Sequence, residues 1–549
     1  MKTNKYFSMT ALAIVIVGAI ITSCSSDNNN NEIVTPPQPV NTDKVVTLKA
    51  SVSMDNDEGG TRALDIDNEK NKVIKTFAAG ERIAVVYKNT SGETVKATSE
   101  ALTSDNIDIA GGSKSADFTV TLTNPDKTKN VTYIYPAAMA KADGSVNYDA
   151  LTTQDGTLAT LASSLDYCEY TGAWSGENLP TGDLGNKFAI CAFTLKDALG
   201  SSEITSSITS LVLTEGSNIY TVSRSAGAGP IYVAIRPTSD KTINFLAGAG
   251  TTTTYAKYVQ NKTYEAGKMY KIGLKMAEVI KGKFSVSSTK QVYFSKGNLQ
   301  ATGTVVGSTT TWTWAFAEHQ WDKIGGKDQS GAGTRTGNNK IIGNGKLSES
   351  GTVDLFGWST GATYLGINNS TENSTYSGGF ADWGSNEDVI AGIGSGWRTL
   401  TSDQWWYLLS PSGSHRTTTS GMQYYKAQVN GVNGLIVFPD DWSDSYHPLT
   451  KANVNNNAIS FESTKIDKST WTNDFEANGA VFLPVAGQRH VNNDYVEYPN
   501  GRGHYWSSTP NDAGTAYRVY FTGSSSEWSY GVSSSRRFGY AVRLVYDIK

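Results

Sequence analysis

Residues 501–521, GRGHYWSSTPNDAGTAYRVYF, contain two runs of strand-forming residues, HYWSST and AYRVYF, on either side of a turn-forming segment. Tyr, Trp, Thr, Val and Phe favour β-strands, whereas Pro, Asn, Asp and Gly favour turns. The stretch therefore predicts a β-hairpin. It also holds one Trp, four Tyr or Phe, two Arg and one His. The hairpin is thus either aromatic core or a surface that contacts a ligand.

The length and composition of the chain predict several mainly β domains. A chain of 549 residues is too long for one hydrophobic core, so we expect roughly three or four domains. Hydrophobic residues make up 38% and charged residues 18%, a balance typical of β-structure with polar turns. The net charge of −4 gives no reason to expect nucleic acid as a partner. Three Cys are too few for a disulfide-dense scaffold.

Residues 1–24 have the pattern of an export signal. Lys2 and Lys5 precede the apolar stretch MTALAIVIVGAIIT, and small residues lead into Cys24. This resembles a bacterial lipoprotein signal, which implies that Cys24 becomes an acylated N-terminus, carrying palmitate, and anchors the protein in the outer membrane. An ordinary secretory signal with a chance Cys is the alternative. Residues 25–44 are polar and Pro-containing and predict an unstructured tether, whose start resembles an export tag of Bacteroidetes surface lipoproteins.

The composition of the chain changes near residues 276–286. All five His and twelve of the thirteen Trp lie after residue 300, which indicates unrelated domains on either side. Before this point, alternating or β-branched runs end at Gly, Asn or Pro and predict strands. These runs are 45–52, 82–89, 116–123, 131–137, 187–195, 207–215, 231–237 and 268–276. Their spacing predicts two antiparallel β-sandwiches in tandem, at 45–165 and 166–276, with a short helix within 150–167.

Cys168 and Cys191 lie in this first half among aromatic and apolar neighbours. An exported protein permits a disulfide between them. We interpret them instead as two small core residues, because nothing in the sequence brings their Cα atoms within bonding range.

Several features of the first half together resemble the fimbrillin family, the subunits of Bacteroidetes pili. They are the lipoprotein signal and the motifs LKASV, GGTRALD, FAAGERIAVVY and EAGKMYKIGLK. The resemblance covers residues 45–276 and implies two transthyretin-like β-sandwiches. It also implies that an arginine-specific protease cuts between Arg62 and Ala63 and removes the first strand, and that a donor strand from another pilin subunit fills the groove. Without the resemblance, Arg62 is simply an exposed turn residue.

The second half predicts an α+β domain over residues 284–549. Strands are expected within 283–300, 309–321, 435–442, 480–489 and 539–545. Residues 397–412 differ, because Thr401 or Ser402 can cap a helix there. Trp405, Trp406, Leu408 and Leu409 are predicted to lie on the buried side of that helix.

Five motifs of this half, in this order, resemble the C-type lectin-like fold. They are GWRTLTSDQWWYLL, VFLPVAGQR, YWSSTP, AYRVYF and RRFGYAVRLV. More narrowly they resemble the branch shared by formylglycine-generating enzymes, Fibrobacter-type paralogous domains and the variable proteins of diversity-generating retroelements. The resemblance implies that Trp506, Val519, Phe521, Gly539, Val542 and Arg543 belong to the core.

That branch includes an enzyme whose chemistry needs a copper-binding pair of Cys. Residues 192–549 contain no Cys, so we expect neither catalysis nor a cofactor. The five His show no ligand spacing, and no metal site is predicted. Asp440 and Asp441 form a possible carboxylate pair, but adjacent side chains on extended backbone point apart, which favours a loop-capping role.

The remaining residues around the hairpin predict a ligand-binding surface. Alternation places Tyr517, Val519 and Phe521 on one face of their strand and Arg518 with Tyr520 on the other, outward face. The Ser-rich segment that follows carries spaced aromatic residues and arginines, the composition of binding hot spots and paratopes. The predicted set is His504, Asn511, Asp512, Arg518, Tyr520, Ser524, Trp528, Tyr530, Arg536 and Arg537. A solvated β-hairpin is the alternative.

Together these features predict a pilus-associated adhesin at the cell surface. A subunit whose C-terminal end continues into a large domain fits the tip of a fimbrium, where it accepts a donor strand and donates none. The expected partners are other pilin subunits, the outer membrane through the lipid anchor, and an unidentified glycan or protein on a host or bacterial surface. The alternative is a stand-alone outer-membrane lipoprotein that binds glycans for a polysaccharide-uptake system.

Overall fold

The computed structural model describes residues 43–54, 65–67, 72–165, 167–325, 336–410, 416, 418–491, 495–523 and 528–549. The predictions for Cys24, Arg62, Ala63, Ser524 and His415 lie outside these residues. The chain forms two units, Met1–Lys44 and Val45–Lys549, and every element below belongs to the second. None of its described helices is long and apolar enough to cross a membrane.

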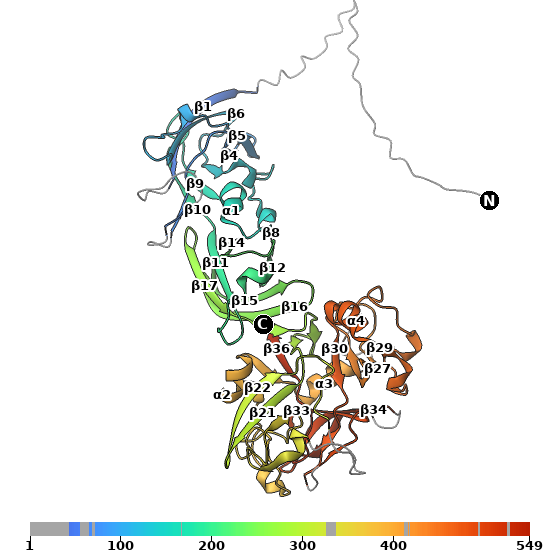
Figure 1. Ribbon diagram of the computed structural model, residues 1–549. Coiled ribbons are helices and arrows are strands. Elements are labelled where there is room, and N and C mark those ends of the chain that lie inside the picture. The colour runs from blue at the N-terminus through green and yellow to red at the C-terminus, as the bar shows by residue number, and fades with distance from the viewer. Residues whose placement is uncertain are drawn as a thin grey trace, which may run out of the picture. The chain divides into compact units, whose positions relative to one another are not determined.

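The protein is mainly β, and its first sheet runs in the order β5-β4-β7-β9-β10-β1-β6 among the described residues (Figure 1). Its strands are β1 (Val45–Met54), β4 (Ala84–Lys88), β5 (Thr94–Thr98), β6 (Ser115–Thr123), β7 (Val131–Tyr135), β9 (Cys168–Gly172) and β10 (Gly182–Asn186). β1 pairs antiparallel with β6 from Val45 to Ser53 and pairs in parallel with β10 near its end. Val52, Phe118 and Tyr133 contribute to the core under this sheet. A small hairpin, β2 (Asp65–Asp67) and β3 (Lys72–Ile74), stands apart from it.

Two further sheets share a second core. One has β11 (Ala189–Lys196) between β14 (Ile231–Ile235) and β17 (Met269–Lys275). The other runs β18-β16-β15-β12-β13-β8, with β8 at Thr153–Gln154, β12 at Ile208–Glu215, β13 at Asn218–Ser223, β15 at Thr238–Ala249, β16 at Thr253–Tyr264 and β18 at Ala277–Val279. Phe193, Leu211 and Phe245 lie in the core that these sheets share. The predicted short helix is α1 (Leu158–Ser164), capped by the Thr157 side chain.

Strands from both sides of the domain boundary predicted between residues 165 and 166 join the same sheets. β9 and β10 follow it in sequence but complete the first sheet through β7 and β1. β8 precedes it but pairs with β13 of the second core. The eight strands predicted by alternation are present, whereas their sorting into sheets depends on partners far away in sequence.

Cys168 and Cys191 are both buried, which confirms the interpretation as two core residues. Cys168 lies in the core under the first sheet, and Cys191 lies in the second core, which the next two sheets share. Burial raises the pKa of the Cys191 thiol, as expected for an inert core cysteine.

The C-terminal part contains several small sheets and short helices. In one sheet, β36 (Leu544–Ile548) pairs antiparallel with both β20 (Gln291–Phe294) and β26 (Trp397–Thr399), and β19 (Phe284–Ser285) flanks β20. The other strands are β21 (Leu299–Val306), β22 (Thr309–Phe316), β23 (Ile341–Gly343), β24 (Lys346–Leu347), β25 (Gly351–Val353), β27 (Tyr424–Val429), β28 (Val432–Val437), β29 (Lys465–Ile466), β30 (Val481–Pro484), β31 (Gln488–Arg489), β32 (Val496–Glu497), β33 (Arg502–Pro510), β34 (Thr515–Thr522) and β35 (Trp528–Ser535). The helices include α2 (Glu387–Ile393), α3 (Ser402–Leu409) and α4 (Lys468–Thr470), which runs into a π-helix at Trp471–Phe475.

The helix predicted at 397–412 is α3, and Thr401 caps it through a capping box with Gln404. Trp405, Leu408 and Leu409 are buried, as predicted. The prediction for Trp406 is wrong, because its side chain is 41% exposed. Consecutive helical residues lie about 100° apart, so one apolar stripe does not bury both Trp side chains fully.

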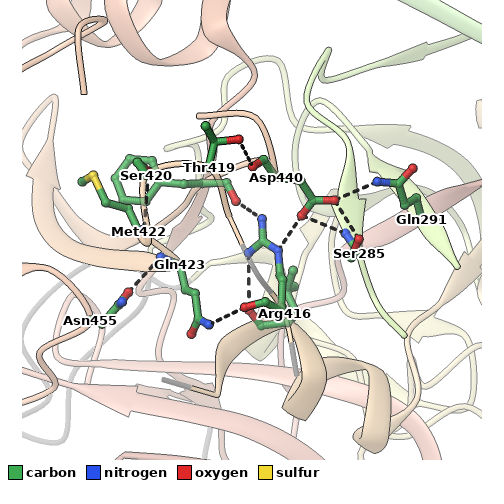
Figure 2. A network of polar contacts seen from close by, with 11 residues as sticks. Ser285, Gln291, Arg416, Thr419, Ser420, Met422, Gln423, Asp440 and Asn455 are labelled. Atoms are coloured by element: carbon green, nitrogen blue, oxygen red, sulfur yellow. Dashed lines mark hydrogen bonds and ion pairs between the residues drawn. The ribbon is translucent and has the colours of Figure 1, made fainter. Parts of the chain in front are cut away.

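A buried ion pair between Arg416 and Asp440 fixes the loop that follows β28 (Figure 2). Arg416 Nε donates to Asp440 Oδ1 over 2.7 Å, and its Nη2 donates to the Phe438 carbonyl. Asp440 Oδ2 also accepts hydrogen bonds from Ser285 Oγ and Gln291 Nε2, each 2.8 Å long. Both carboxylate oxygens of Asp440 therefore accept hydrogen bonds within the fold, in keeping with the predicted loop-capping role.

Candidate ligand-binding site

The hairpin predicted at 501–521 is present as β33 and β34, and β35 extends it to a three-stranded sheet. Across the first pair, Arg502 faces Thr522, His504 faces Tyr520 and Trp506 faces Arg518. The register between β34 and β35 shifts between Arg518 and Tyr520. The three polar or aromatic pairs thus lie along the same face of the β33–β34 ladder.

The residues assigned to the core are buried, which confirms that part of the prediction. Trp506 is 1% exposed, and its Nε1 donates to the Phe356 carbonyl over 2.7 Å. Buried with it are Val519, Phe521, Gly539, Val542 and Arg543. Tyr517 differs from the expectation, since it is only half-buried. Opposite faces of the sheet contribute to two cores, one holding Trp506 and the other Phe521.

His504 was expected on an exposed face, and the structure corrects this. Its side chain is buried, with the ring stacked on Tyr540 at 4.6 Å and 6° and lying 4.8 Å from Tyr520. Burial, followed by the nearby Arg518 and Arg502 charges, lowers the pKa of His504 well below 6.5. This burial could not be predicted from local alternation, because the covering residue Tyr540 lies in a different sequence motif.

Arg518 and Tyr520 remain half-exposed and lie together, as predicted. The Arg518 guanidinium is 4.5 Å from the Tyr520 ring and 5.2 Å from the Tyr540 ring. Its Nη1 donates to His504 Nδ1 over 2.7 Å, so the neutral imidazole carries its proton on Nε2. Among the described residues, neither His504 Nε2 nor Arg518 Nε has a hydrogen-bond partner, although both atoms are buried. Two donors without acceptors therefore flank the half-exposed pair.

Arg536 is not a surface contact, and its prediction as a ligand-binding residue is wrong. It is buried, with its guanidinium 4.1 Å from the Trp358 ring. Nε donates to the Thr515 carbonyl at 3.1 Å, Nη1 to the Tyr376 and Gly378 carbonyls at 3.0 Å each, and Nη2 to the Asp512 carbonyl. The fixed fork of donors on an arginine suits such a cluster of backbone acceptors, so Arg536 holds loops in place.

The other predicted contacts lie at the edges of the sheet. Asn511 and Asp512 are exposed in the β33–β34 turn, where Asp512 Oδ1 accepts hydrogen bonds from the Gly514 and Thr515 amides. Arg537 is half-buried, and its Nη1 donates to the Thr371 carbonyl over 2.5 Å. The side chains of Trp528 and Tyr530 lie outside the described part of the chain, although the backbone of Trp528 pairs with Phe521.

Sequence reasoning missed three residues of this site. Tyr540 forms the stacking surface behind His504 and Arg518. Beside the hairpin, the Arg502 guanidinium lies 3.7 Å above the ring of Tyr498, which is 39% exposed. The position of Arg502 two residues before His504 was the available signal, because alternation places both on one face. The described residues contain no group of three His, Cys, Asp or Glu side chains placed to hold a metal ion.

Comparisons with known proteins give limited matches. A family model described as "Domain of unknown function (DUF8237)" matches residues 436–545. No curated protein matches the sequence. A structure of a "putative cell adhesion protein" from Bacteroides fragilis is 14% identical, covers 50% of this chain and 99% of that one, and has a TM-score of 0.24. A C-terminally truncated tip fimbrial protein, Mfa3 from Porphyromonas gingivalis, is 9% identical, covers 50% and 100%, and has a TM-score of 0.22. A "putative cell adhesion protein" from Bacteroides uniformis is 17% identical, covers 42% and 94%, and has a TM-score of 0.24.

Proposed function

We propose that the protein is a pilus-associated adhesin of the cell surface and that it occupies the tip of a fimbrium. In this proposal residues 45–276 are a fimbrillin-like pair of transthyretin-like sandwiches that joins the fibre. Residues 284–549 are a C-type lectin-like domain that contacts a glycan or protein on another surface. Acylation of Cys24 delivers the subunit to the outer membrane before assembly.

The position of β1 in the first sheet carries this proposal. β1 is the strand between β10 and β6, and among the described residues β6 has its long ladder with β1 alone. Its inward side chains Ala50, Val52 and Met54 are buried in the first core. Cleavage after Arg62 would separate β1 from the rest of the chain. Its loss would leave a groove with a free β6 edge and an exposed apolar floor, which suits β-strand addition by a neighbouring subunit.

The position of β36 favours the tip over the shaft. β36 is hydrogen-bonded on both sides, to β20 and to β26. A strand that is already paired along both edges is not available to complete the sheet of another subunit. The subunit therefore accepts a strand through its first sheet without donating β36 to a neighbour.

The half-exposed Arg518–Tyr520 pair supports the ligand-binding role of the C-terminal part. Arginine and tyrosine are enriched in binding hot spots, and this pair is held rigidly against Tyr540. The buried, unpartnered donors beside it favour a ligand that supplies acceptor oxygens. We propose no catalytic activity and no cofactor.

Labelling of fibres tests the assignment against its alternative. Gold-labelled antibody against residues 284–549 should mark one end of isolated fibres, and the Arg62→Ala variant should be missing from them. A stand-alone glycan-binding lipoprotein of a polysaccharide-uptake system would instead give label over the outer membrane and unlabelled fibres. That result would overturn the tip proposal and favour the alternative.

A further inference from the structure

We propose that residues 441–447 and the π-helix Trp471–Phe475 form a second ligand-binding site, one that takes a neutral, polyhydroxylated ligand such as a terminal sugar. The site uses no residue of the β33–β35 sheet and goes beyond the function proposed above. Residues 441–447 follow β28, in the loop that begins at the Arg416–Asp440 pair. The π-helix comes later in the chain, directly after α4. π-Helices are rare and frequently mark functional sites.

Stacked aromatic rings make the floor of this site. Phe475 stacks on Trp442 at 5.6 Å and 21° and on Trp471 at 5.5 Å and 6°. All three side chains have 0% exposure. The floor is therefore rigid, and it fixes whatever residues stand on it.

Two consecutive residues, Tyr446 and His447, pack against these rings. The Tyr446 and Trp442 rings form an edge-to-face pair, with their centroids 5.3 Å apart and an angle of 75° between the ring planes. His447 lies 4.8 Å from Phe475. A hydrogen bond of 3.1 Å from the Tyr446 amide to the Ser443 carbonyl closes the turn that carries both. Tyr446 is 42% exposed, so part of its aromatic side chain is open to a ligand.

The polar groups around this face are mainly acceptors. His447 Nδ1 lies 2.9 Å from Asp474 Oδ2, and a proton on Nδ1 leaves the Nε2 lone pair of the neutral ring as an acceptor. Asp444 Oδ2 pairs with Lys451, whereas Asp444 Oδ1 is buried and has no hydrogen-bond partner among the described residues. Acceptors held in place beside an open aromatic ring suit a ligand that presents hydroxyl donors and a nonpolar C–H face.

The local charge selects a neutral ligand. Four acidic residues and one lysine lie in 441–451 and 471–476, which repels acidic sugars. The acids are Asp441, Asp444, Asp474 and Glu476, and the lysine is Lys451. The Asp444 carboxylate pairs with Lys451, and Asp474 Oδ2 contacts the His447 ring, which reduces the attraction of these two carboxylates for a cationic ligand. Neutral hydroxyl groups remain the best match.

Titration of the full chain with free sugars tests this inference. The probes are galactose, mannose, fucose and N-acetylglucosamine, with N-acetylneuraminic acid as the acidic comparison, and binding is followed by saturation-transfer NMR. At least one neutral sugar should bind and the acidic one should not. Tyr446→Ala should weaken binding about tenfold or more, because it removes the aromatic face. Tyr148→Ala removes a tyrosine of similar exposure, 36%, from the first half of the chain and should bind like wild type.

His447→Gln serves as the second variant if Tyr446→Ala fails to fold, and it should also weaken binding because the fixed acceptor is lost. Sugar binding that Arg518→Ala abolishes and Tyr446→Ala leaves unchanged would belong to the site proposed on β33–β35 and would overturn this inference. Failure of all four neutral sugars to bind would overturn the inference, whatever the fibre-labelling result. Unchanged binding by folded Tyr446→Ala or by His447→Gln would also overturn it.

Discussion

At the scale of single residues, burial rather than residue type distinguishes the side chains that hold the fold together from those that could contact a ligand. Arg536 and Arg537 are neighbours in the same Ser-rich segment, yet the first is 3% exposed and the second is half-buried. Arg536 donates to four backbone carbonyls, whereas the described contacts of Arg537 include one such hydrogen bond. An arginine that donates to carbonyls from several loops stabilises the fold, and removing it breaks all four of these hydrogen bonds.

Arg536→Ala should therefore lower the free energy of unfolding by about 3 kcal/mol or more, since it removes a buried guanidinium that joins four backbone carbonyls. Arg537→Ala is the matched control and should cost less than about 1 kcal/mol. Urea unfolding of both variants measures the difference. Equal stability of the two variants would show that the Arg536 contacts do not hold the loops.

Trp506→Ala should destabilise the C-terminal part by about 3–5 kcal/mol, because it leaves an aromatic-sized cavity and removes the hydrogen bond from the indole Nε1 to the Phe356 carbonyl. Trp406→Ala removes a Trp that is 41% exposed and should cost less than about 1 kcal/mol. Thermal melting of the two variants checks the assignment. A larger loss of stability for Trp406→Ala than for Trp506→Ala would mean that Trp406, not Trp506, belongs to the core.

Lys426 gives the stability a specific pH dependence. It is buried, its Nζ donates to the Asn457 and Thr522 carbonyls at 2.6 Å each, and burial lowers its pKa from 10.5 to about 8. Between pH 8 and pH 10.5 the unfolded chain binds more protons at Lys426 than the folded chain does. The free energy of unfolding should therefore rise with pH in this window, by about 3 kcal/mol in total.

Lys426→Met removes the titrating group, so the wild type should gain stability relative to this variant as the pH rises from 8 to about 10. Urea unfolding at several pH values measures the gap between the two. Parallel stability curves would mean that Lys426 titrates alike in the folded and unfolded chains.

At the scale of elements, alternation and capping were good guides where the contacts are local. β33, β34 and α3 follow from residues next to each other in sequence, and Thr401 caps its helix as its position predicts. The crossing of β9 and β10 into the first sheet depends on pairing with distant β7 and β1, which no local pattern reveals. The burial of His504 and Arg536 likewise depends on Tyr540 and Trp358, from other elements. The proximity of Arg518 and Tyr520 could be predicted, because both residues lie on the same face of one strand.

The Arg416–Asp440 pair links elements that are distant in sequence. Asp440→Ala should cost about 3–5 kcal/mol of stability, because Arg416 would remain buried without its counter-ion and Ser285 and Gln291 would lose an acceptor. Asp441→Ala changes the adjacent, exposed carboxylate and should cost less than about 1 kcal/mol. Similar melting temperatures for the two variants would show that the ion pair contributes little.

At the scale of the whole molecule, two strands define how the subunit would assemble. β1 belongs to the first sheet but precedes the predicted cleavage site, and β36 belongs to a sheet that pairs it on both sides. Under the proposed function, a subunit that loses β1 and keeps β36 paired would accept one neighbour and end the fibre. The C-terminal part then carries the two proposed ligand-binding sites, around Arg518 and around Tyr446.

N-terminal sequencing of the protein recovered from purified fibres tests this view most directly. We expect the protein to be present in fibres and its mature chain to begin at Ala63, with Arg62→Ala retained as an uncut lipoprotein outside them. A mature chain that begins at an acylated Cys24, in a protein absent from the fibres, would contradict strand exchange through β1 and with it the tip assignment.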